Sequence, residues 1–255
     1  MFHKKVLSEW KKVKMKVIND LLGYKNLNIV QDTQMFSFSL DSVLLPNFIT
    51  LNKKVEKILD IGCGNGPIPL ILSTKTNAKI IGVEIQPEVA ALANESVKLN
   101  NLNNQIQIIN DDINNLVKNL ETEMFDVITC NPPFFKALET SNFNQSDYKT
   151  IARHEVNLTI EQVIKISRKL LKNKGILGIV HRPERLMEIL FLLNENNLIP
   201  KKIKFVYPRF NSEANMVLIE AKKNGNPGLK VLEPLFVHQD NGDYTDYVKK
   251  YFENR

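Results

Sequence analysis

The chain has 255 residues, of which 43% are hydrophobic and 24% charged, as expected for a soluble globular protein with one sizeable domain. No apolar run approaches the roughly 20 residues that cross a membrane, and no signal peptide is apparent, so a reducing, cytoplasmic setting is expected. The two cysteines, Cys63 and Cys130, form no CxxC pattern and lie near no histidine cluster, which argues against a disulfide framework and against a metal site.

Positive charge is concentrated at the N-terminus, where residues 1–25 hold seven lysines against two acidic residues. Apolar residues in 2–22 recur at spacings of three and four, which predicts a basic amphipathic helix over residues 1–25. The charge favours a polyanion such as nucleic acid as partner, although a solvated lysine-rich face has the same pattern. The lysines that could contact phosphate are Lys4, Lys5, Lys11, Lys12, Lys14 and Lys16.

Residues 26–255 are predicted to form the main domain, and residues 26–54 a segment that precedes its first buried strand. In the run "MFSFSLDSVLLPNFI" a strand end is followed by a helix, with Ser39 as the N-cap and Asp41 near the helix start. From residue 55 onward, buried strands alternate with helices. The expected strands are 55–62, 78–84, 104–110, 125–131 and 175–181, and the expected helices are 67–75, 87–100, 112–120, 159–173 and 183–195.

Two further strands, near 200–207 and 214–222, have no long helix between them and are therefore predicted to form an antiparallel hairpin at the sheet edge. Together the elements predict a Rossmann-like α/β fold with a mainly parallel seven-stranded sheet and helices on both faces. Residues 226–255 contain Pro227, Gly228 and Pro234 near their start and are expected to wrap the body as a tail.

A glycine-rich stretch, "DIGCGNG" at 60–66, follows the first buried strand and precedes a helix. Its glycines allow a tight turn and a close approach of the backbone to a ligand. The spacing differs from a dinucleotide fingerprint, and the carboxylate of Asp60 would repel a pyrophosphate. Asp60 instead suits a cationic ligand such as S-adenosylmethionine, which carries a sulfonium and an ammonium group.

Acidic residues also end the next two strands. Glu84 is placed to accept hydrogen bonds from ribose hydroxyls, and Asp111 or Asp112 from an adenine amino group. Each acid alone could be a turn or helix-capping residue, but together with the glycines they predict an S-adenosylmethionine site. Its expected residues are Asp60, Gly62, Cys63, Gly64, Gly66, Glu84, Ile85, Asp111, Asp112, Ile113 and Asn131.

The fourth strand ends in "NPPF", residues 131–134, at the edge of the sheet where α/β proteins bind ligands. The carbonyl groups of Asn131 and Pro132 could accept hydrogen bonds from an exocyclic amine and free its lone pair for methylation, while Pro133 helps to fix the turn. Phe134 offers a face on which a flipped or unpaired base could stack. The simpler alternative is a Pro-Pro turn with buried phenylalanines, and Phe135 is expected in the core or on the same substrate surface.

The motifs "DIGCGNG" and "NPPF", together with "VEIQPE" at 83–88, are similar to those of class I S-adenosylmethionine-dependent methyltransferases with an N-P-P-aromatic motif. Flanking segments, including "FSFSLDSVLL", "ARHE" and "GDYTDYV", resemble bacterial enzymes that methylate N6 of adenine 37 in valine tRNA. The resemblance implies that Asn131, Pro132, Pro133 and Phe134 hold the target adenine of the anticodon loop. It also implies that Asp41 lies in a segment closing over the substrate and that Arg153 and His154 contact RNA.

Three alternatives remain open at this point. They are a ribosomal RNA guanine-N2 methyltransferase, a protein glutamine methyltransferase acting on release factors, and a non-catalytic RNA-binding module. His181, at the end of the fifth strand, could face substrate, but a histidine with its hydrogen bonds satisfied at a strand end is favoured. No metal and no membrane contact are expected, and the expected oligomeric state is a monomer.

Overall fold

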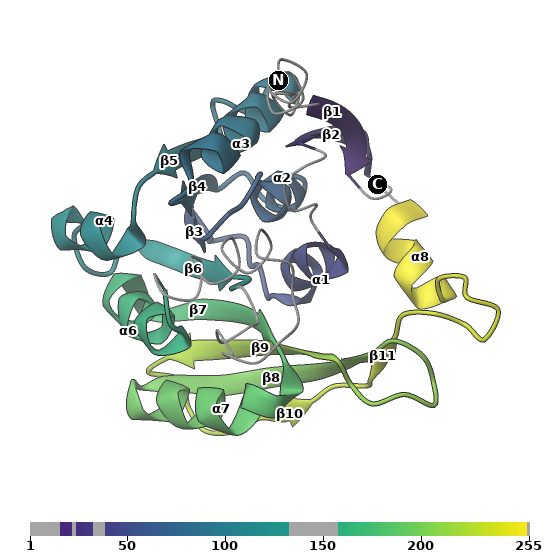
Figure 1. Ribbon diagram of the computed structural model, residues 1–255. Helices are drawn as coiled ribbons and strands as arrows, with labels where there is room; N and C mark the ends of the chain where they lie inside the picture. Colours follow the sequence, from purple (N-terminus) through teal and green to yellow (C-terminus); the bar gives the residue numbers. More distant parts are fainter. Residues whose placement is uncertain (1–15, 22–23, 33–38, 133–157, 254–255) are drawn as a thin grey trace, which may run out of the picture.

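A computed structural model describes residues 16–21, 24–32, 39–132 and 158–253, which form an α/β fold around one large sheet (Figure 1). The seven long strands lie in the order β8-β9-β7-β6-β3-β4-β5. They are β3 (Lys57–Ile61), β4 (Lys79–Glu84), β5 (Ile106–Asn110), β6 (Phe125–Cys130), β7 (Leu171–His181), β8 (Leu198–Tyr207) and β9 (Met216–Lys223).

Strands β3 to β7 are mutually parallel, whereas β9 lies antiparallel between β7 and β8. The prediction of a mainly parallel seven-stranded sheet with an antiparallel edge hairpin is therefore confirmed. Within the expected tail, two short strands, β10 (Lys230–Val231) and β11 (Leu235–Phe236), pair with β8 and extend the sheet to nine strands.

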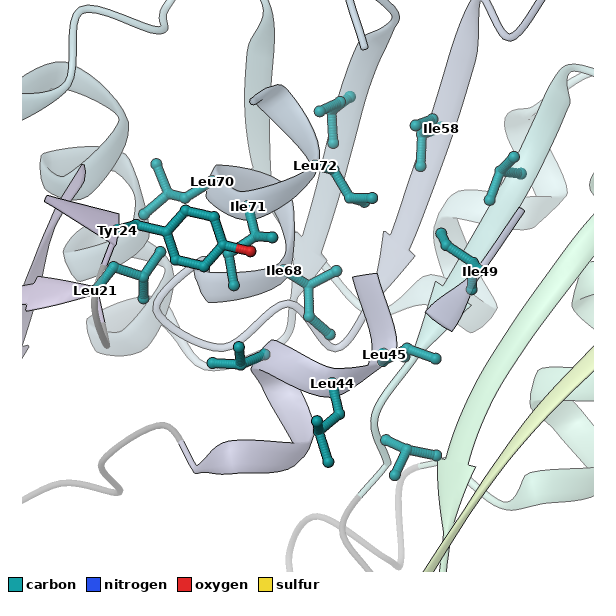
Figure 2. Packing of buried hydrophobic residues seen from close by; sticks show 14 of the residues in the cluster. Leu21, Tyr24, Leu44, Leu45, Ile49, Ile58, Ile68, Leu70, Ile71 and Leu72 are labelled. Atoms are coloured by element: carbon teal, nitrogen blue, oxygen red, sulfur yellow. The ribbon is translucent and has the colours of Figure 1, made fainter. Parts of the chain in front are cut away.

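Helices cover both faces of the sheet. Residues along each buried strand point alternately to opposite sides, so both faces carry apolar side chains that the helices bury. In β3, Ile58 belongs to one core cluster and Leu59 to the other. The first cluster lies under α1 (Leu40–Phe48), α2 (Pro67–Ser73) and α3 (Pro87–Leu99), and Figure 2 shows its packing. The second lies under α4 (Ile113–Asn119), α6 (Ile160–Leu170) and α7 (Leu186–Glu195), which follows the 3-10 turn η1 (Pro183–Arg185). A last helix, α8 (Asp246–Glu253), was not predicted from the sequence.

The predicted N-terminal helix is wrong in its second half. Residues Lys16–Leu21 form strand β1, which pairs antiparallel with β2 (Tyr24–Asp32). The β-branched pair Val17 and Ile18 favours an extended backbone, and β2 supplies the hydrogen-bond partners that the strand needs. Residues 1–15, and with them Lys4, Lys5, Lys11, Lys12 and Lys14, lie outside the described residues.

Gly178 of β7 determines how closely the end of α1 can approach the sheet. A Cβ atom at this position would lie 2.4 Å from Cγ2 of Ile49, far inside normal contact distance. We expect Gly178→Ala to lower the free energy of unfolding by about 2 kcal/mol, because the buried neighbours must shift to relieve the overlap. Urea denaturation measures the change. Since Ile49→Ala removes the overlapping atom, the double variant should lose less than the two single variants combined, and an additive loss would contradict this explanation.

Among the described residues, no helix is long and apolar enough to cross a membrane. The same residues contain no group of three or more histidine, cysteine or acidic side chains that could hold a metal ion.

Candidate active site

The predicted site residues gather where β3, β4, β5 and β6 end. These strands are parallel and adjacent, so their carboxyl ends meet at one edge of the sheet (Figure 1). The loop after β3 is tied to β4 by two backbone hydrogen bonds, in which the N–H groups of Gly62 and Cys63 donate to the carbonyl oxygen of Val83 at 2.9 and 3.0 Å. The loop therefore has a fixed position beside the end of β4.

The glycine loop has the backbone shape that its sequence predicts. Gly62 and Gly64 have φ angles of 69° and 58°, in the left-handed region that favours glycine. An added Cβ atom would meet no heavy atom within 4 Å at either position, so the space beside the loop is open to a ligand. Gly66 precedes α2 with a φ angle of 93°. The side chain of Cys63 is buried against Gly82, so Cys63 could contact a ligand through its backbone.

Asp60 is completely buried at the end of β3, and only one of its two carboxylate oxygens accepts a hydrogen bond. The hydroxyl of Thr129 donates to Oδ1 at 2.6 Å, whereas Oδ2 has no hydrogen-bond partner among the described residues. Burial raises the pKa of Asp60 to about 7, the Thr129 hydrogen bond opposes that rise, and the nearby charge of Glu84 adds to it. An unsatisfied buried acceptor beside an open glycine loop fits a ligand that brings a positive charge or a hydrogen-bond donor.

Glu84 ends β4 with both carboxylate oxygens directed at backbone groups. Oε2 accepts the N–H of Gly64 at 3.0 Å and Oε1 accepts the N–H of Gln86 at 2.9 Å. Each oxygen retains a lone pair that a hydroxyl donor could use. The neighbouring side chain of Ile85 is 36% exposed and offers an apolar contact at the same place.

The two acids after β5 have different local roles. Asp112 is the N-cap of α4, since its Oδ1 accepts the N–H of Asn114 at 2.8 Å. Asp111 lies next to the end of β4, where its N–H donates to the carbonyl oxygen of Glu84 at 3.2 Å. Ile113 is buried in the second core cluster, so its side chain packs within the fold.

Asn131 follows β6 and is held through its amide nitrogen. Nδ2 donates to Oδ2 of Asp41 at 3.0 Å and to the hydroxyl oxygen of Ser42 at 3.2 Å. The amide oxygen accepts no hydrogen bond from the described residues. Pro132 is buried next to it. Pro133, Phe134, Phe135, Arg153 and His154 lie outside the described residues, so their predicted roles stay predictions.

The start of α1 brings Asp41 to this edge. Ser39 occupies the N-cap position as predicted, but its hydroxyl donates to the carboxylate of Asp41 instead of capping a backbone N–H. Asp41 is only 4% exposed. The sequence had indicated Asp41 but not Ser42 or Thr129, whose contacts join segments 89 and 69 residues apart.

Two predicted residues are engaged elsewhere in the fold. Lys16 forms a surface ion pair with Glu95 of α3, and its side chain stays 52% exposed, so its predicted contact with RNA stays a prediction. His181 is 1% exposed and its Nδ1 accepts the N–H of Arg182 at 2.8 Å. Burial, followed by the charge of Arg185, lowers the pKa of His181 to about 4, which keeps the ring neutral. This supports the favoured interpretation of His181 as a satisfied strand-end histidine.

The sequence matches the family described as methyltransferase small domain over residues 26–196. A relative from Flavobacterium psychrophilum, named tRNA1(Val) (adenine(37)-N6)-methyltransferase, is 29% identical over 205 residues, which cover 80% of this chain and 86% of the relative. A protein of the same name from Porphyromonas gingivalis is 27% identical over 240 residues, covering 90% of this chain and 92% of that protein.

Solved structures share the fold at low sequence identity. The structure of a predicted O-methyltransferase from Agrobacterium tumefaciens superimposes with a TM-score of 0.65 and 19% identity, covering 83% of this chain and 94% of that one. TYW2 of M. jannaschii, solved in complex with AdoMet, gives a TM-score of 0.54 and 16% identity over 82% of this chain and 86% of that one.

Proposed function

The chain belongs to the methyltransferase small domain family, and from this premise we propose that it transfers a methyl group from S-adenosylmethionine to N6 of adenine 37 in a valine tRNA. One observation carries the proposal: Asn131 directly follows β6, its amide nitrogen is hydrogen-bonded to Asp41, and its amide oxygen is not engaged by the described residues. The names of the relatives supply the substrate, since the Flavobacterium and Porphyromonas proteins are both named for adenine 37 of tRNA1(Val).

The cofactor fits the residues at the strand ends. The unsatisfied Oδ2 of Asp60 suits a cationic ligand, and the open space beside Gly62 and Gly64 allows the ligand to approach the backbone. We assign the ribose hydroxyls to Glu84 and the adenine amino group to the acids after β5, where Asp112 also caps a helix. When bound, S-adenosylmethionine supplies an electrophilic methyl group.

Asn131 and Pro132 would prepare the substrate amine. An exocyclic amine of a base is a weak nucleophile because its lone pair is delocalised into the ring. If the amide oxygen of Asn131 and the carbonyl oxygen of Pro132 accept its two N–H groups, the nitrogen becomes more tetrahedral and the lone pair is localised. A proline at 133 would leave no competing N–H donor at the turn, and Phe134 would stack on the base. Positioning thus supplies most of the catalysis, and the proton can leave to water.

The anticodon loop is a suitable substrate because its bases are unpaired and available for stacking. Arg153, His154 and the lysines of residues 1–15 are the proposed contacts to the RNA backbone, and a tRNA substrate implies a cytoplasmic enzyme.

Transfer of a radiolabelled methyl group tests the proposal directly. Purified protein is incubated with labelled S-adenosylmethionine and total tRNA from cells that lack N6-methylation of adenine 37. We expect label in N6-methyladenosine after nuclease digestion, and only in valine tRNA when the tRNA pool is fractionated. Label in N2-methylguanosine of ribosomal RNA, or in a release factor added to a parallel reaction, would instead support one of the alternative methyltransferases.

The affinity for S-adenosylmethionine is expected to rise with pH through the pKa of Asp60. Because that pKa is about 7, the carboxylate is mostly protonated at pH 6 and mostly ionised at pH 8, and a cationic ligand favours the ionised form. We expect the dissociation constant to fall about tenfold between these pH values, as the ionised fraction rises. Isothermal titration calorimetry between pH 6 and pH 8 measures the dissociation constant. Asp60→Asn should remove the part of its pH dependence that comes from Asp60.

Stability of the free protein should show the opposite trend. Between the ordinary pKa of an unfolded aspartate and about 7, the folded protein holds a proton on Asp60 that the unfolded chain has released. The contribution of Asp60 therefore makes the fold less stable as the pH rises through this window. Denaturation of the wild type and of Asp60→Asn at pH 5 and pH 8 isolates the contribution. Equal pH dependence in the two proteins would contradict the raised pKa.

A further inference from the structure

A pair of side-chain hydrogen bonds links the start of α1 to the amide of Asn131 across about 90 residues of sequence. Nδ2 of Asn131 donates to Oδ2 of Asp41 and to the hydroxyl oxygen of Ser42. The two partners differ in what they can accept and donate. A hydroxyl both donates and accepts, so Ser42 could face either end of an amide, whereas a carboxylate only accepts. Asp41 is therefore the partner that distinguishes the two ends of the amide.

This difference settles the orientation of the amide by chemistry. An oxygen of Asn131 turned toward Asp41 would place two acceptors in contact, with no proton between them. The nitrogen must face the carboxylate, and the amide oxygen must then face away from α1. That direction leaves the oxygen available at the end of β6.

Asp41 is itself held in place and so can act as a fixed reference. Its Oδ1 accepts the N–H of Ser42 at 3.0 Å and the hydroxyl of Ser39. The helix that carries it is anchored by Leu44 and Leu45, which are buried in the first core cluster and are labelled in Figure 2. The carboxylate also lies in the first turn of α1, where the helix dipole favours negative charge.

We propose that Asp41 is a positioning residue that sets the orientation of the Asn131 amide, so that its oxygen and not its nitrogen faces the substrate amine. The proposal rests on the proposed function, because methyl transfer depends on that oxygen as an acceptor. Asp41 acts through Asn131 and needs no contact with substrate or cofactor. The segment before the first buried strand thereby contributes to catalysis through a side chain buried in the fold.

The proposal predicts an unusual order among variants. In Asp41→Asn, the new amide oxygen is retained by the N–H of Ser42, so its nitrogen faces Asn131. The Asn131 amide then turns its oxygen to position 41 and presents N–H groups to a substrate amine that also carries N–H groups. In Asp41→Ala, the Asn131 amide is free to adopt either orientation. The isosteric variant should therefore be the more damaged of the two, the reverse of what a purely structural role predicts.

Single-turnover and steady-state kinetics with the tRNA substrate measure this order. We expect kcat to fall about 50-fold in Asp41→Asn and about fivefold in Asp41→Ala, because the first misorients the acceptor and the second only releases it. The dissociation constant for S-adenosylmethionine should stay within about twofold in both, since neither removes a cofactor contact. Glu184→Gln is the matched control, because Glu184 is exposed on η1 and is expected to have unchanged kinetics. A loss in Asp41→Ala equal to or larger than that in Asp41→Asn would overturn the proposal.

A double-variant cycle separates positioning from folding. If Asp41 acts through the amide, Asp41→Asn should have little further effect once Asn131→Ala has removed it. Full additivity of the two losses would show that Asp41 acts independently of Asn131 and would also overturn the proposal.

A structural measurement tests the orientation without any activity. In ¹⁵N-labelled protein, the side-chain amide signal of Asn131 is assigned by its disappearance in Asn131→Ala. We expect one of its protons to be protected from exchange in the wild type and unprotected in Asp41→Ala. Absence of protection in the wild type would refute the orientation. A wild type with that protection but no methyl transfer to tRNA would instead refute the proposed function and leave the orientation standing.

Discussion

Replacing Asn131 with alanine is expected to lower kcat for methyl transfer by about 10³-fold, because the preorganised acceptor that localises the lone pair of the amine is lost. This corresponds to about 4 kcal/mol of transition-state stabilisation. Asn131 is also among the expected cofactor residues, but cofactor affinity should change little, because the contacts assigned to Asp60, Glu84 and the glycine loop are untouched. The loss should therefore fall on kcat and on kcat/KM together, as for an interaction made in the transition state.

The measurement combines steady-state kinetics with calorimetric titration of S-adenosylmethionine into the same preparation. Asn104→Ala is a matched control, because it removes an exposed amide between α3 and β5, away from the sheet edge that carries the site. It should leave both kcat and cofactor affinity unchanged. Turnover of Asn131→Ala within tenfold of the wild type would show that the amide is not the acceptor and that Pro132 or another group prepares the amine.

Asn131→Asp adds a test of the surroundings of the amide. It would place a second carboxylate within hydrogen-bond distance of Asp41, where two adjacent negative charges repel one another. One of the pair should hold a proton with a raised pKa, and residual activity should depend on pH in a way that the wild type does not. A pH profile of kcat from 5 to 9 records this difference.

The sequence predicted the central sheet because its signals are local. Each parallel strand is a short buried run, such as "KILDI" at 57–61, that is followed by residues favouring a turn and then by a helix. The acids and the glycines fall at strand ends, and parallel strands bring those ends to one edge. Asp60, Glu84, Asp111 and Asn131 could therefore be placed together without knowledge of any side-chain contact.

The N-terminal hairpin could not be predicted in the same way. Val17 and Leu21 are spaced as on a helix face, yet their extended conformation is decided by pairing with β2, which in turn lies against α3. Tertiary contacts commonly override a local pattern of this kind. The partners of the site residues were missed for a related reason, since Thr129 and Ser42 reach their partners across distant segments, and a sequence pattern does not indicate such contacts.

Replacing Glu84 with alanine is expected to weaken S-adenosylmethionine binding about 150-fold, because two charge-assisted hydrogen bonds to the ribose hydroxyls are lost at about 1.5 kcal/mol each. The carboxylate is well placed for this role, being 5% exposed and oriented by the N–H groups of Gly64 and Gln86. Its position is therefore set before the ligand arrives, and little side-chain entropy is lost on binding.

The same two backbone contacts complicate Glu84→Ala, since their loss could loosen the glycine loop as well as remove the ribose contacts. Glu84→Gln keeps the volume of the side chain but has one amide oxygen and no charge, so it accepts only one of these two backbone N–H groups and does not by itself separate the two effects. We expect Glu84→Gln to weaken binding about tenfold, in line with neutral in place of charged hydrogen bonds. If ribose recognition dominates, 2′-deoxy and 3′-deoxy analogues of S-adenosylhomocysteine should bind the wild type less tightly than the parent compound but bind Glu84→Ala equally well. If Glu84→Ala still bound the deoxy analogues less tightly than the parent compound, the ribose would be bound by other residues. Glu84 would then serve only to hold Gly64 in place.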